Sequence, residues 1–456
     1  MSVSASRKIA FEVLRRVEAE GAYASDVLHA ELGPAVKPAD AALATELTLG
    51  VLRWRRLLDF LLEQQLKKPL ARMDLPVALA LRMGLYQLRY LEKIPARAAV
   101  HESVELVKQA KKSSASSLVN AVLRRLAEEA RRPVESSLLP GLPAAERLGI
   151  LHSHPTSMVE RWLTRWGEPR TVALLEANNR APRLSCALNE PARRDDIFAS
   201  LEKAGLRVEP GRLLRTAFAV SGGSPARTEA FRHGWISIQD EASQAIPLLL
   251  DVQAGDRAAD LCAAPGGKTA ALARAAGPHG MVVAADRHAH RLRAMKEQFA
   301  RLGLLDVRVV ELDAAHALPF REPFQRILVD APCSGTGTLA RHPEIRWRLR
   351  AEQLAELHAL QTTMLRAAAE RLAPGGRLVY STCSLETEEN EAVVAEVLAR
   401  EPSLRPVPFP ETARELSPHL AEGVSAESLF DAEGNFRTLP GEQPTDGFFA
   451  AVLQKR

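Results

Sequence analysis

The segment Asp260-Leu-Cys-Ala-Ala-Pro-Gly-Gly-Lys-Thr269 predicts the start of a βαβ unit, because an apolar run meets a Pro-Gly-Gly turn and a helix-forming run follows at 270–276. Gly266 and Gly267 would let a ligand approach the backbone closely, and a helix N-terminus favours electronegative groups. Asp286 ends the apolar run 281–285 about 20 residues later, where an acid suits the ribose hydroxyls of an adenosine cofactor.

Two common nucleotide-binding loops do not match this segment. It lacks Gly-x-Gly-x-x-Gly, which argues against a dinucleotide. Cys262 stands where a P-loop would have glycine, which argues against ATP. A different adenosine cofactor is therefore expected, with a plain turn as the alternative.

The overall composition indicates a multidomain protein. A chain of 456 residues predicts two or three domains. No run of about 18 apolar residues exists, so no membrane span is expected, and the N-terminal stretch predicts an amphipathic helix rather than a signal peptide. The cysteines are scattered without a metal-type pair, so we expect a reducing cytoplasm and no metal site; they are Cys186, Cys262, Cys333 and Cys383.

The first 130 residues have the apolar spacing of helices, as in Ile9, Val13 and Val17, and predict a compact bundle. Residues 1–132 hold 22 basic and 15 acidic side chains, whereas the remainder holds 38 and 41. This basic excess fits a domain that meets a polyanion, although a solvated helical surface is an equal alternative. The same alternative applies to the arginines beside Trp54, which could contact RNA: Arg53, Arg55 and Arg56.

The rest of the chain predicts a linker and two α/β regions. Residues 133–150 are rich in Pro and Gly. Short strands around a helix at 197–204 predict a small α/β module over 151–233. Beyond residue 234, strands are expected at 257–262, 281–285, 307–311, 326–330 and 376–381, with helices between them, which predicts a parallel sheet covered on both faces. We expect an edge strand at 447–453 and surface loop at 402–445.

Reactive side chains follow two of these strands. One strand ends at Asp330 and is followed by Cys333, and another ends just before Cys383. Because parallel strands present their carboxyl ends to the same edge of a sheet, these residues and the Gly-rich loop should converge on one crevice. Single cysteines are usually small buried hydrophobic residues, and we assign that role to Cys186 and Cys262.

Two thiols and an acid beside an adenosine cofactor suit methyl transfer to carbon 5 of a pyrimidine. Carbon 5 is a poor nucleophile until a thiolate adds to carbon 6. A carboxyl group could meet N3 and the exocyclic amine, and a second thiol could assist elimination of the first.

Three motifs resemble those of the RNA cytosine-5 methyltransferases of the Nol1/Nop2/Sun family: Asp260–Thr269, Asp330-Ala-Pro-Cys-Ser-Gly-Thr-Gly337 and Ser381-Thr-Cys-Ser384. Gln239-Asp-Glu-Ala-Ser-Gln244 is similar to the family's permuted N-terminal motif. The resemblance extends over nearly the whole chain and points to the bacterial Sun/Fmu (RsmB) branch. It implies an all-α NusB-like RNA-binding bundle (1–132), a linker (133–150), a small α/β, RRM-like module (151–233) and a Rossmann-like class I methyltransferase domain (234–456).

The resemblance also implies S-adenosyl-L-methionine as methyl donor and a cytosine in the small-subunit head of 16S ribosomal RNA as target, free or in early assembly. Cys383 matches the family's nucleophile, Cys333 the cysteine that assists release, and Asp330 and Lys268 further catalytic positions. The positions that match its cofactor contacts are Cys262, Ala263, Ala264, Pro265, Gly266, Gly267, Lys268, Asp286, Asp313 and Asp330. Asp313 follows a predicted strand, and there the alternative to adenine contact is a turn cap.

An arginine-rich segment adjoins the Asp330 motif. We predict that it contacts RNA near the target base through Arg341, Arg346, Arg348 and Arg350, with a solvated helix start as the alternative. We expect a monomer. The rival functions are an RNA-binding factor with an inactive enzyme domain, and a DNA cytosine methyltransferase in which Cys333 would be the nucleophile.

Overall fold

In a computed structural model of the protein, residues 3–33, 35–134 and 139–456 are described. The chain divides into two compact units. The first, a helical unit, contains residues 1–181 and a return segment, residues 339–348. The second, an α/β unit, contains residues 182–338 and 349–456. The return segment therefore begins just after the Cys333 motif, residues 330–337, and interrupts the sequence of the α/β unit.

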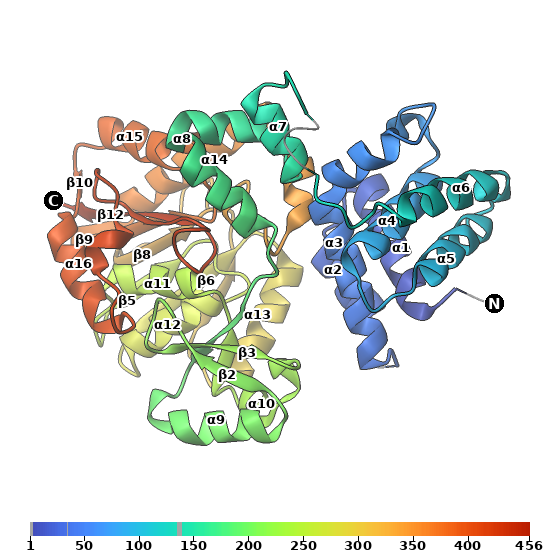
Figure 1. Ribbon diagram of the computed structural model, residues 1–456. Coiled ribbons are helices and arrows are strands. Elements are labelled where there is room, and N and C mark those ends of the chain that lie inside the picture. Colours follow the sequence, from blue (N-terminus) through green and yellow to red (C-terminus); the bar gives the residue numbers. More distant parts are fainter. Residues whose placement is uncertain (1–2, 34, 135–138) are drawn as a thin grey trace. The chain divides into compact units, whose positions relative to one another are not determined.

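The N-terminal part of the helical unit is a bundle, as the apolar spacing predicted (Figure 1). Its core consists of buried leucines and valines from every long helix, such as Leu14, Leu58, Leu81 and Leu123. The helices are α1 (Ala5–Glu20), α2 (Ala24–Glu31), α3 (Pro38–Glu63), α4 (Leu75–Tyr90), α5 (Ala96–Gln109) and α6 (Ser116–Ala127), with short 3₁₀ turns η1 (Leu70–Arg72) and η2 (Ser113–Ala115).

The predicted linker is partly helical. Helix α7 (Ala144–Leu151) lies within it, and Ile150 packs against Leu57 and Leu139. Residues 135–138 of this linker lie outside the described residues. Helix α8 (Thr156–Asn178) follows and is kinked at Gly167, whose φ is +72°. Both helices belong to the helical unit, so this unit extends past the predicted domain end at residue 132.

The α/β unit begins with a small antiparallel sheet of order β2-β3-β1-β4. Phe218, Ile197 and Leu201 are fully buried where α9 packs on the sheet. The elements are β1 (Leu184–Leu188), α9 (Arg194–Lys203), β2 (Arg207–Pro210), β3 (Ala217–Ser221), α10 (Glu229–Arg232) and β4 (Ile236–Ile238). The small module was thus predicted, but β4 carries its sheet past the predicted boundary at residue 233.

The large sheet has the order β10-β12-β9-β8-β5-β6-β7, with β11 paired to β12. Strands β5 to β9 are parallel neighbours, which confirms the predicted parallel sheet, whereas β12 runs antiparallel to β9. The strands are β5 (Arg257–Asp260), β6 (Met281–Asp286), β7 (Arg308–Glu311), β8 (Phe324–Asp330), β9 (Leu372–Thr382), β10 (Leu404–Pro406), β11 (Phe436–Thr438) and β12 (Phe448–Lys455).

Two expectations for the C-terminal region were wrong. The apolar run at 447–453 forms β12, which lies between β9 and β10 and is not an edge strand. Its side chains are buried on both faces, as expected of an interior strand. Residues 402–445 are not simply surface loop, because α16 (Phe409–Leu416) and β11 bring the buried residues Leu416 and Phe436 into the core.

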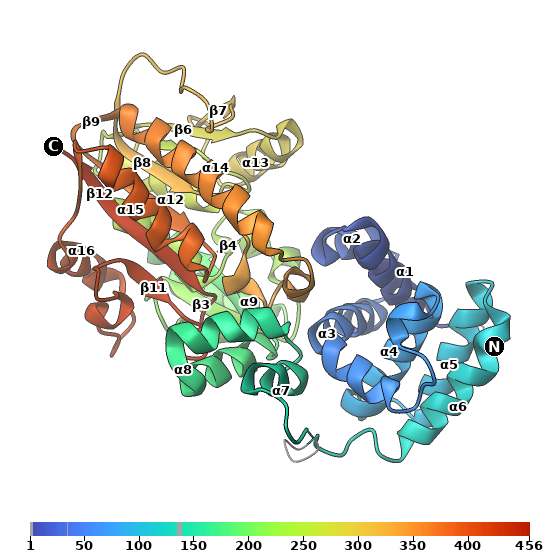
Figure 2. The same cartoon turned by 90° about the horizontal axis from the view of Figure 1, so that it is seen from above.

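Helices cover both faces of the large sheet, and Figure 2 shows α14 and α15 lying along the same face. On that face Leu365 and Val393 pack against Ile327 and Leu378. The opposite face is covered by α12, α16 and the turn η6 (Ile246–Leu250), with Leu272 and Leu249 among the buried side chains. The helices are α11 (Glu241–Ala245), α12 (Gly267–Ala276), α13 (Ala289–Arg301), α14 (Ala351–Glu370) and α15 (Glu391–Arg400).

No helix in the described part of the chain is long and apolar enough to span a membrane.

Candidate active site

The Pro-Gly-Gly turn joins β5 to α12 in a tightly packed loop. Gly266 has φ of +102°, a conformation that favours glycine. A Cβ atom at this position would lie 2.8 Å from Met295 Cγ and 2.9 Å from Phe299 Cε1. The Gly266 N–H donates to Ala263 O at 2.7 Å, which closes the turn. Packing of the loop on α13 therefore requires glycine here, in addition to any close approach by a ligand.

Asp260, at the end of β5, ties the strand to the helix beyond the loop. Its Oδ2 accepts a hydrogen bond of 2.7 Å from Thr269 Oγ1, in the first turn of α12. Burial raises the pKa of Asp260 to about 7, even though the Thr269 hydrogen bond lowers it. A carboxyl group that is partly protonated near neutral pH can both donate and accept hydrogen bonds.

A cofactor-side cavity of about 310 Å³ lies where strands of the large sheet end. Ligands of open α/β sheets bind at this edge, and ligand pockets typically start at about 300 Å³. Most of the predicted site residues line it together: Cys262, Ala264, Asp286, Asp313, Asp330, Cys333 and Cys383. The predicted convergence of the loop, the acids and the two cysteines is therefore observed in the structure.

Two acids that line this cavity, Asp286 and Asp313, already have protein partners. Asp286 Oδ1 accepts the His288 N–H at 3.0 Å, and its Oδ2 lies 3.2 Å from the Arg291 guanidinium. Asp313 Oδ1 accepts the Ala315 N–H at 2.9 Å, so Asp313 does cap a turn. Because Asp313 also lines the cavity, the cap does not remove it from the candidate cofactor contacts.

Asp330 lies at the centre of the site and is held from two sides. Lys268 Nζ donates to its Oδ2 at 2.7 Å, and Ser381 Oγ donates to its Oδ1 at 2.8 Å. Burial lowers the pKa of Lys268, but the charge and hydrogen bond of Asp330 outweigh it, so the pKa is raised overall. The pair therefore presents a fixed carboxylate and a fixed ammonium group, side by side.

The two predicted catalytic sulfurs are neighbours. Cys333 Sγ and Cys383 Sγ lie 3.4 Å apart, and neither cysteine is in a disulfide. The hydrogen bond with Cys383 raises the pKa of the Cys333 thiol, and burial and nearby negative charge raise it further. Burial also raises the pKa of Cys262 and of Cys186. Cys186 is fully buried, which fits its predicted packing role, whereas Cys262 is partly buried and also lines the cavity.

A second cavity, of about 250 Å³, adjoins the first. Both cavities are lined by Cys262, Ala264 and Asp330. Four further predicted loop residues line only this second cavity, together with Gln239: Ala263, Pro265, Gly267 and Lys268. Gly266 lines neither of the two cavities. Asp330 can therefore be reached from the cofactor-side cavity and from the second cavity.

The return segment does not resemble the exposed arginine cluster that we predicted. Arg346 is 1% exposed, and burial lowers its pKa. Its guanidinium donates to Ser153 O at 3.0 Å and to Asn179 Oδ1 at 2.9 Å, within the helical unit. Arg348 donates to Ala22 O. For Arg346 the predicted RNA contact therefore conflicts with its burial. Arg341, Arg348 and Arg350 stay predictions.

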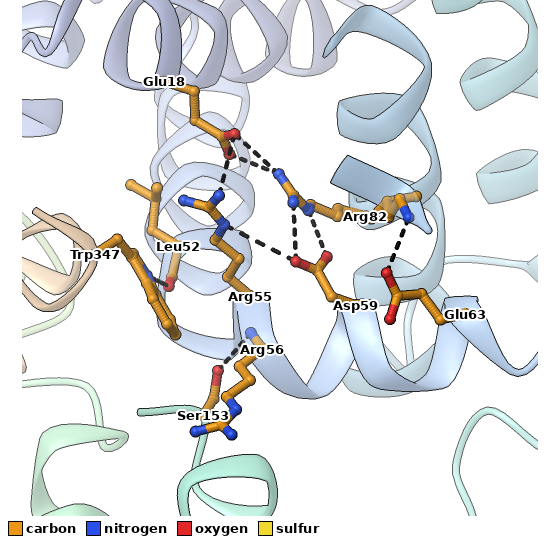
Figure 3. Close-up of polar contacts among 10 residues, drawn as sticks. Glu18, Leu52, Arg55, Arg56, Asp59, Glu63, Arg82, Ser153 and Trp347 are labelled. Carbon is orange, nitrogen blue, oxygen red and sulfur yellow. Dashed lines mark hydrogen bonds and ion pairs between the residues drawn. The ribbon is translucent and has the colours of Figure 1, made fainter. Parts of the chain in front are cut away.

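The arginines beside Trp54 also bind protein, and Figure 3 shows two of them, Arg55 and Arg56. Arg55 lies 3.7 Å from Glu18 and its guanidinium is 5.6 Å from the centre of the Trp347 ring. Arg56 donates to His154 O at 2.6 Å, and Arg53 donates to Ala340 O at 2.9 Å. These contacts explain the arginines without RNA.

Several residues around the sulfurs were not predicted: Ser334, Gln361, Ser381, Ser384 and Glu389. Glu389 lies in a run of acids that precedes a helix, which is a common and uninformative pattern. In the part of the chain that the structure describes, no group of three or more His, Cys, Asp or Glu side chains could hold a metal ion.

Comparison with protein-family models gives three matches along the chain. Residues 247–454 match the family described as 16S rRNA methyltransferase RsmB/F. Residues 4–128 match the NusB family, and residues 154–227 match the ferredoxin-like domain of RsmF/B-like methyltransferases.

Full-length relatives and solved structures show the same similarity. The chain is 33% identical to the probable ribosomal RNA small subunit methyltransferase B of Bacillus subtilis, over 100% of both chains. It is 36% identical to the ribosomal RNA small subunit methyltransferase B of Pseudomonas putida, over 91% of both. The crystal structure of PH0851 shares the fold, with a TM-score of 0.79 over 100% of both chains at 24% identity. A methyltransferase homologue from Pyrococcus horikoshii is 29% identical, with a TM-score of 0.56, over 69% of this chain and 100% of its own.

Proposed function

Because this chain belongs to the RsmB/F family of 16S rRNA methyltransferases, we propose that it methylates carbon 5 of one cytosine in 16S ribosomal RNA through a covalent cysteine–C6 adduct. The observation that carries this proposal is the 3.4 Å separation of Cys333 Sγ and Cys383 Sγ beside Asp330. Methyl transfer to a base nitrogen or to a ribose hydroxyl has no use for paired thiols, whereas addition to carbon 6 requires a thiolate.

The cofactor-side cavity fits S-adenosyl-L-methionine, which supplies the methyl group when bound. Asp286, at the end of β6, stands where a carboxylate meets ribose hydroxyls. Asp313 would contact the adenine side, and Cys262 and Ala264 would hold the remainder within this cavity. The loop residues Ala263, Pro265, Gly267 and Lys268 would contact the part of the cofactor that extends into the second cavity. Asp330 lines this cavity together with both cysteines, so the cofactor would be held next to the reacting base.

The side chains would then divide the chemistry of the base among them. The Cys383 thiolate adds to carbon 6, which makes carbon 5 electron-rich. Asp330, with Lys268, binds N3 and the exocyclic amine and favours the charge distribution of the adduct. After methylation a base takes the proton from carbon 5, the electron pair of that C–H bond re-forms the C5–C6 double bond, and the Cys383 sulfur leaves carbon 6 as a thiolate; Cys333, 3.4 Å away, assists this release.

The proposed substrate is 16S ribosomal RNA of the small-subunit head, free or in an early assembly intermediate, and the proposed enzyme acts as a cytoplasmic monomer. The test is to incubate the full chain with tritiated S-adenosyl-L-methionine and deproteinised 16S ribosomal RNA, followed by bisulfite sequencing. We expect one cytosine to become resistant to bisulfite. Label at another atom, such as a ribose oxygen, would contradict the proposal, and transfer to DNA instead would favour the DNA methyltransferase alternative.

A further inference from the structure

The loops that carry the two catalytic cysteines are joined by one buried carboxylate. Glu389 is fully buried in the turn η9 (Thr387–Glu389). Its Oε2 accepts hydrogen bonds from Ser334 Oγ and, at 2.5 Å, from Ser384 Oγ. Ser334 directly follows Cys333 and Ser384 directly follows Cys383. One carboxylate oxygen therefore links the residues next to both sulfurs.

The other carboxylate oxygen binds the Cys333 loop a second time. Oε1 accepts the Ser334 N–H at 2.8 Å and the Gln361 side-chain amide at 3.0 Å. The same Gln361 amide donates to Pro332 O at 2.9 Å, on the other side of Cys333. Thus Cys333 is held from both flanking residues.

The loops also share a direct backbone contact, since the Gly337 N–H donates to Cys383 O at 2.9 Å. A Cβ atom at position 337 would lie 2.9 Å from the same oxygen, so the loops pack at the closest approach that a glycine allows. Two further direct links do not involve Glu389: the Leu385 N–H donates to Thr336 Oγ1 at 2.9 Å, and Ser334 Oγ lies 3.0 Å from Ser384 Oγ. Glu389 is the group that binds the residues next to both sulfurs through one carboxylate.

We propose that Glu389 is a positioning residue: it ties the Cys333 loop to the Cys383 loop and thereby sets the distance between the two reacting sulfurs. The proposal rests on the proposed function for its catalytic consequence, but its geometric part stands without it. A carboxylate suits this task because its two oxygens accept from four donors, whereas a glutamine side chain would turn an NH₂ group toward two of them.

The negative charge of Glu389 also affects the Cys333 thiol. The groups that face Cys333 are Cys383, Glu389 and Asp330, and each of them raises the pKa of the Cys333 thiol, with the Cys383 hydrogen bond and burial as the largest causes. Glu389 therefore favours the protonated form of the Cys333 thiol.

A bridging reagent tests the geometry without any need for activity. Phenylarsine oxide joins two neighbouring thiols: two As–S bonds form, and the arsenic-bound oxygen leaves as water with the two thiol protons. We would titrate it into the full chain and follow the protection of Cys333 and Cys383 from alkylation by mass spectrometry. In Glu389→Ala the sulfurs are no longer held together, and we expect bridging to weaken by about tenfold or more.

Methyl transfer provides the second measurement. In Glu389→Ala the single-turnover rate should fall by about 10²-fold, while the affinity for RNA stays unchanged, because only the alignment of reacting groups is lost. The matched control is Glu241→Ala, which removes an equally buried carboxylate that accepts three backbone N–H groups and contacts neither cysteine loop. A loss of general stability would affect both variants, whereas loss of positioning affects only the first.

Ser384→Ala is the second variant, because Glu389→Ala leaves buried donors unpaired and could fail to fold. It cuts one link between Glu389 and the Cys383 loop and should weaken bridging in the same direction. A folded Glu389→Ala protein, or Ser384→Ala if the former does not fold, with wild-type bridging and wild-type single-turnover rate would overturn the proposal. Weakened bridging in a protein whose wild type methylates no RNA would support the positioning role and refute the proposed function.

Discussion

Two adjacent stretches of this chain are rich in polar side chains, yet only one of them forms a candidate site. The Cys333 motif, residues 330–337, lies at the end of a parallel strand and presents Asp330 and a thiol to a cavity. The return segment, residues 339–348, buries Arg346 among carbonyl groups of the helical unit. From residue types and their order alone, the sequence predicts a functional role for both stretches. What differs is access to a cavity: Asp330 and Cys333 line one although they have protein partners, whereas Arg346 is 1% exposed.

The largest expected effect tests the cysteine side of this comparison. Cys383→Ala should reduce methyl transfer by about 10⁴-fold or more, because it removes the proposed nucleophile. Cys333→Ala should instead trap a covalent protein–RNA adduct, visible as a gel shift that survives denaturant. Cys186→Ala, in the core of the small sheet, is the matched control and should retain transfer. Reversed phenotypes for the first two variants would exchange the proposed roles.

The next effect tests the arginine side. Arg346→Ala should lower the free energy of unfolding by about 4 kcal/mol, because several buried acceptors lose their donor. Thermal unfolding of the full chain measures this, with the exposed Arg350→Ala as control, expected within about 0.5 kcal/mol of wild type. If Arg346→Ala left the melting temperature unchanged and weakened only RNA binding, the contrast between the two stretches would fail.

A pH-dependent effect follows from Asp260, whose carboxyl is buried beside the cysteine site. Its pKa is about 7 in the fold, above its ordinary value of 3.8, so the folded protein binds a proton that the unfolded chain releases. Stability from this group is therefore complete below about pH 4 and is lost as the pH rises through 7, on the order of 4 kcal/mol. Asp260→Asn should remove this dependence. The melting temperature of the variant, relative to that of wild type, should therefore increase between pH 5 and pH 8. An unchanged difference between the two proteins over that range would contradict the raised pKa.

The smallest effect concerns the exposed end of the arginine segment. If Arg350 contacts a phosphate, Arg350→Ala should weaken RNA binding by about 1 kcal/mol and reduce the slope of log affinity against log salt by about 1. Filter binding at several salt concentrations measures both quantities. An unchanged slope would indicate that Arg350 makes no phosphate contact with RNA.

Local rules predicted the site better than they predicted the surroundings. Strand ends of a parallel sheet converge for topological reasons, so Cys333 and Cys383 could be brought together without knowledge of any distance. The roles of Arg346 and Glu389 depend on partners far along the chain, such as Ser153 for the first and Ser334 for the second. No local pattern distinguishes a buried arginine or glutamate with such partners from an exposed one. The interior position of β12 is indicated by its sequence, because its apolar run does not alternate with polar residues.

The return segment also has a consequence for taking the protein apart. The polypeptide enters the helical unit at its start, leaves it after residue 181, and re-enters it at 339–348 before completing the α/β unit. A methyltransferase fragment made by cutting near residue 181 would contain the return segment but not the helical unit. Arg346 and Trp347 would then lose the carbonyl groups to which they donate hydrogen bonds. Exchange of the helical unit, in evolution or in the laboratory, would have to replace residues 1–181 and 339–348 together, because the second segment lies within the sequence of the α/β unit.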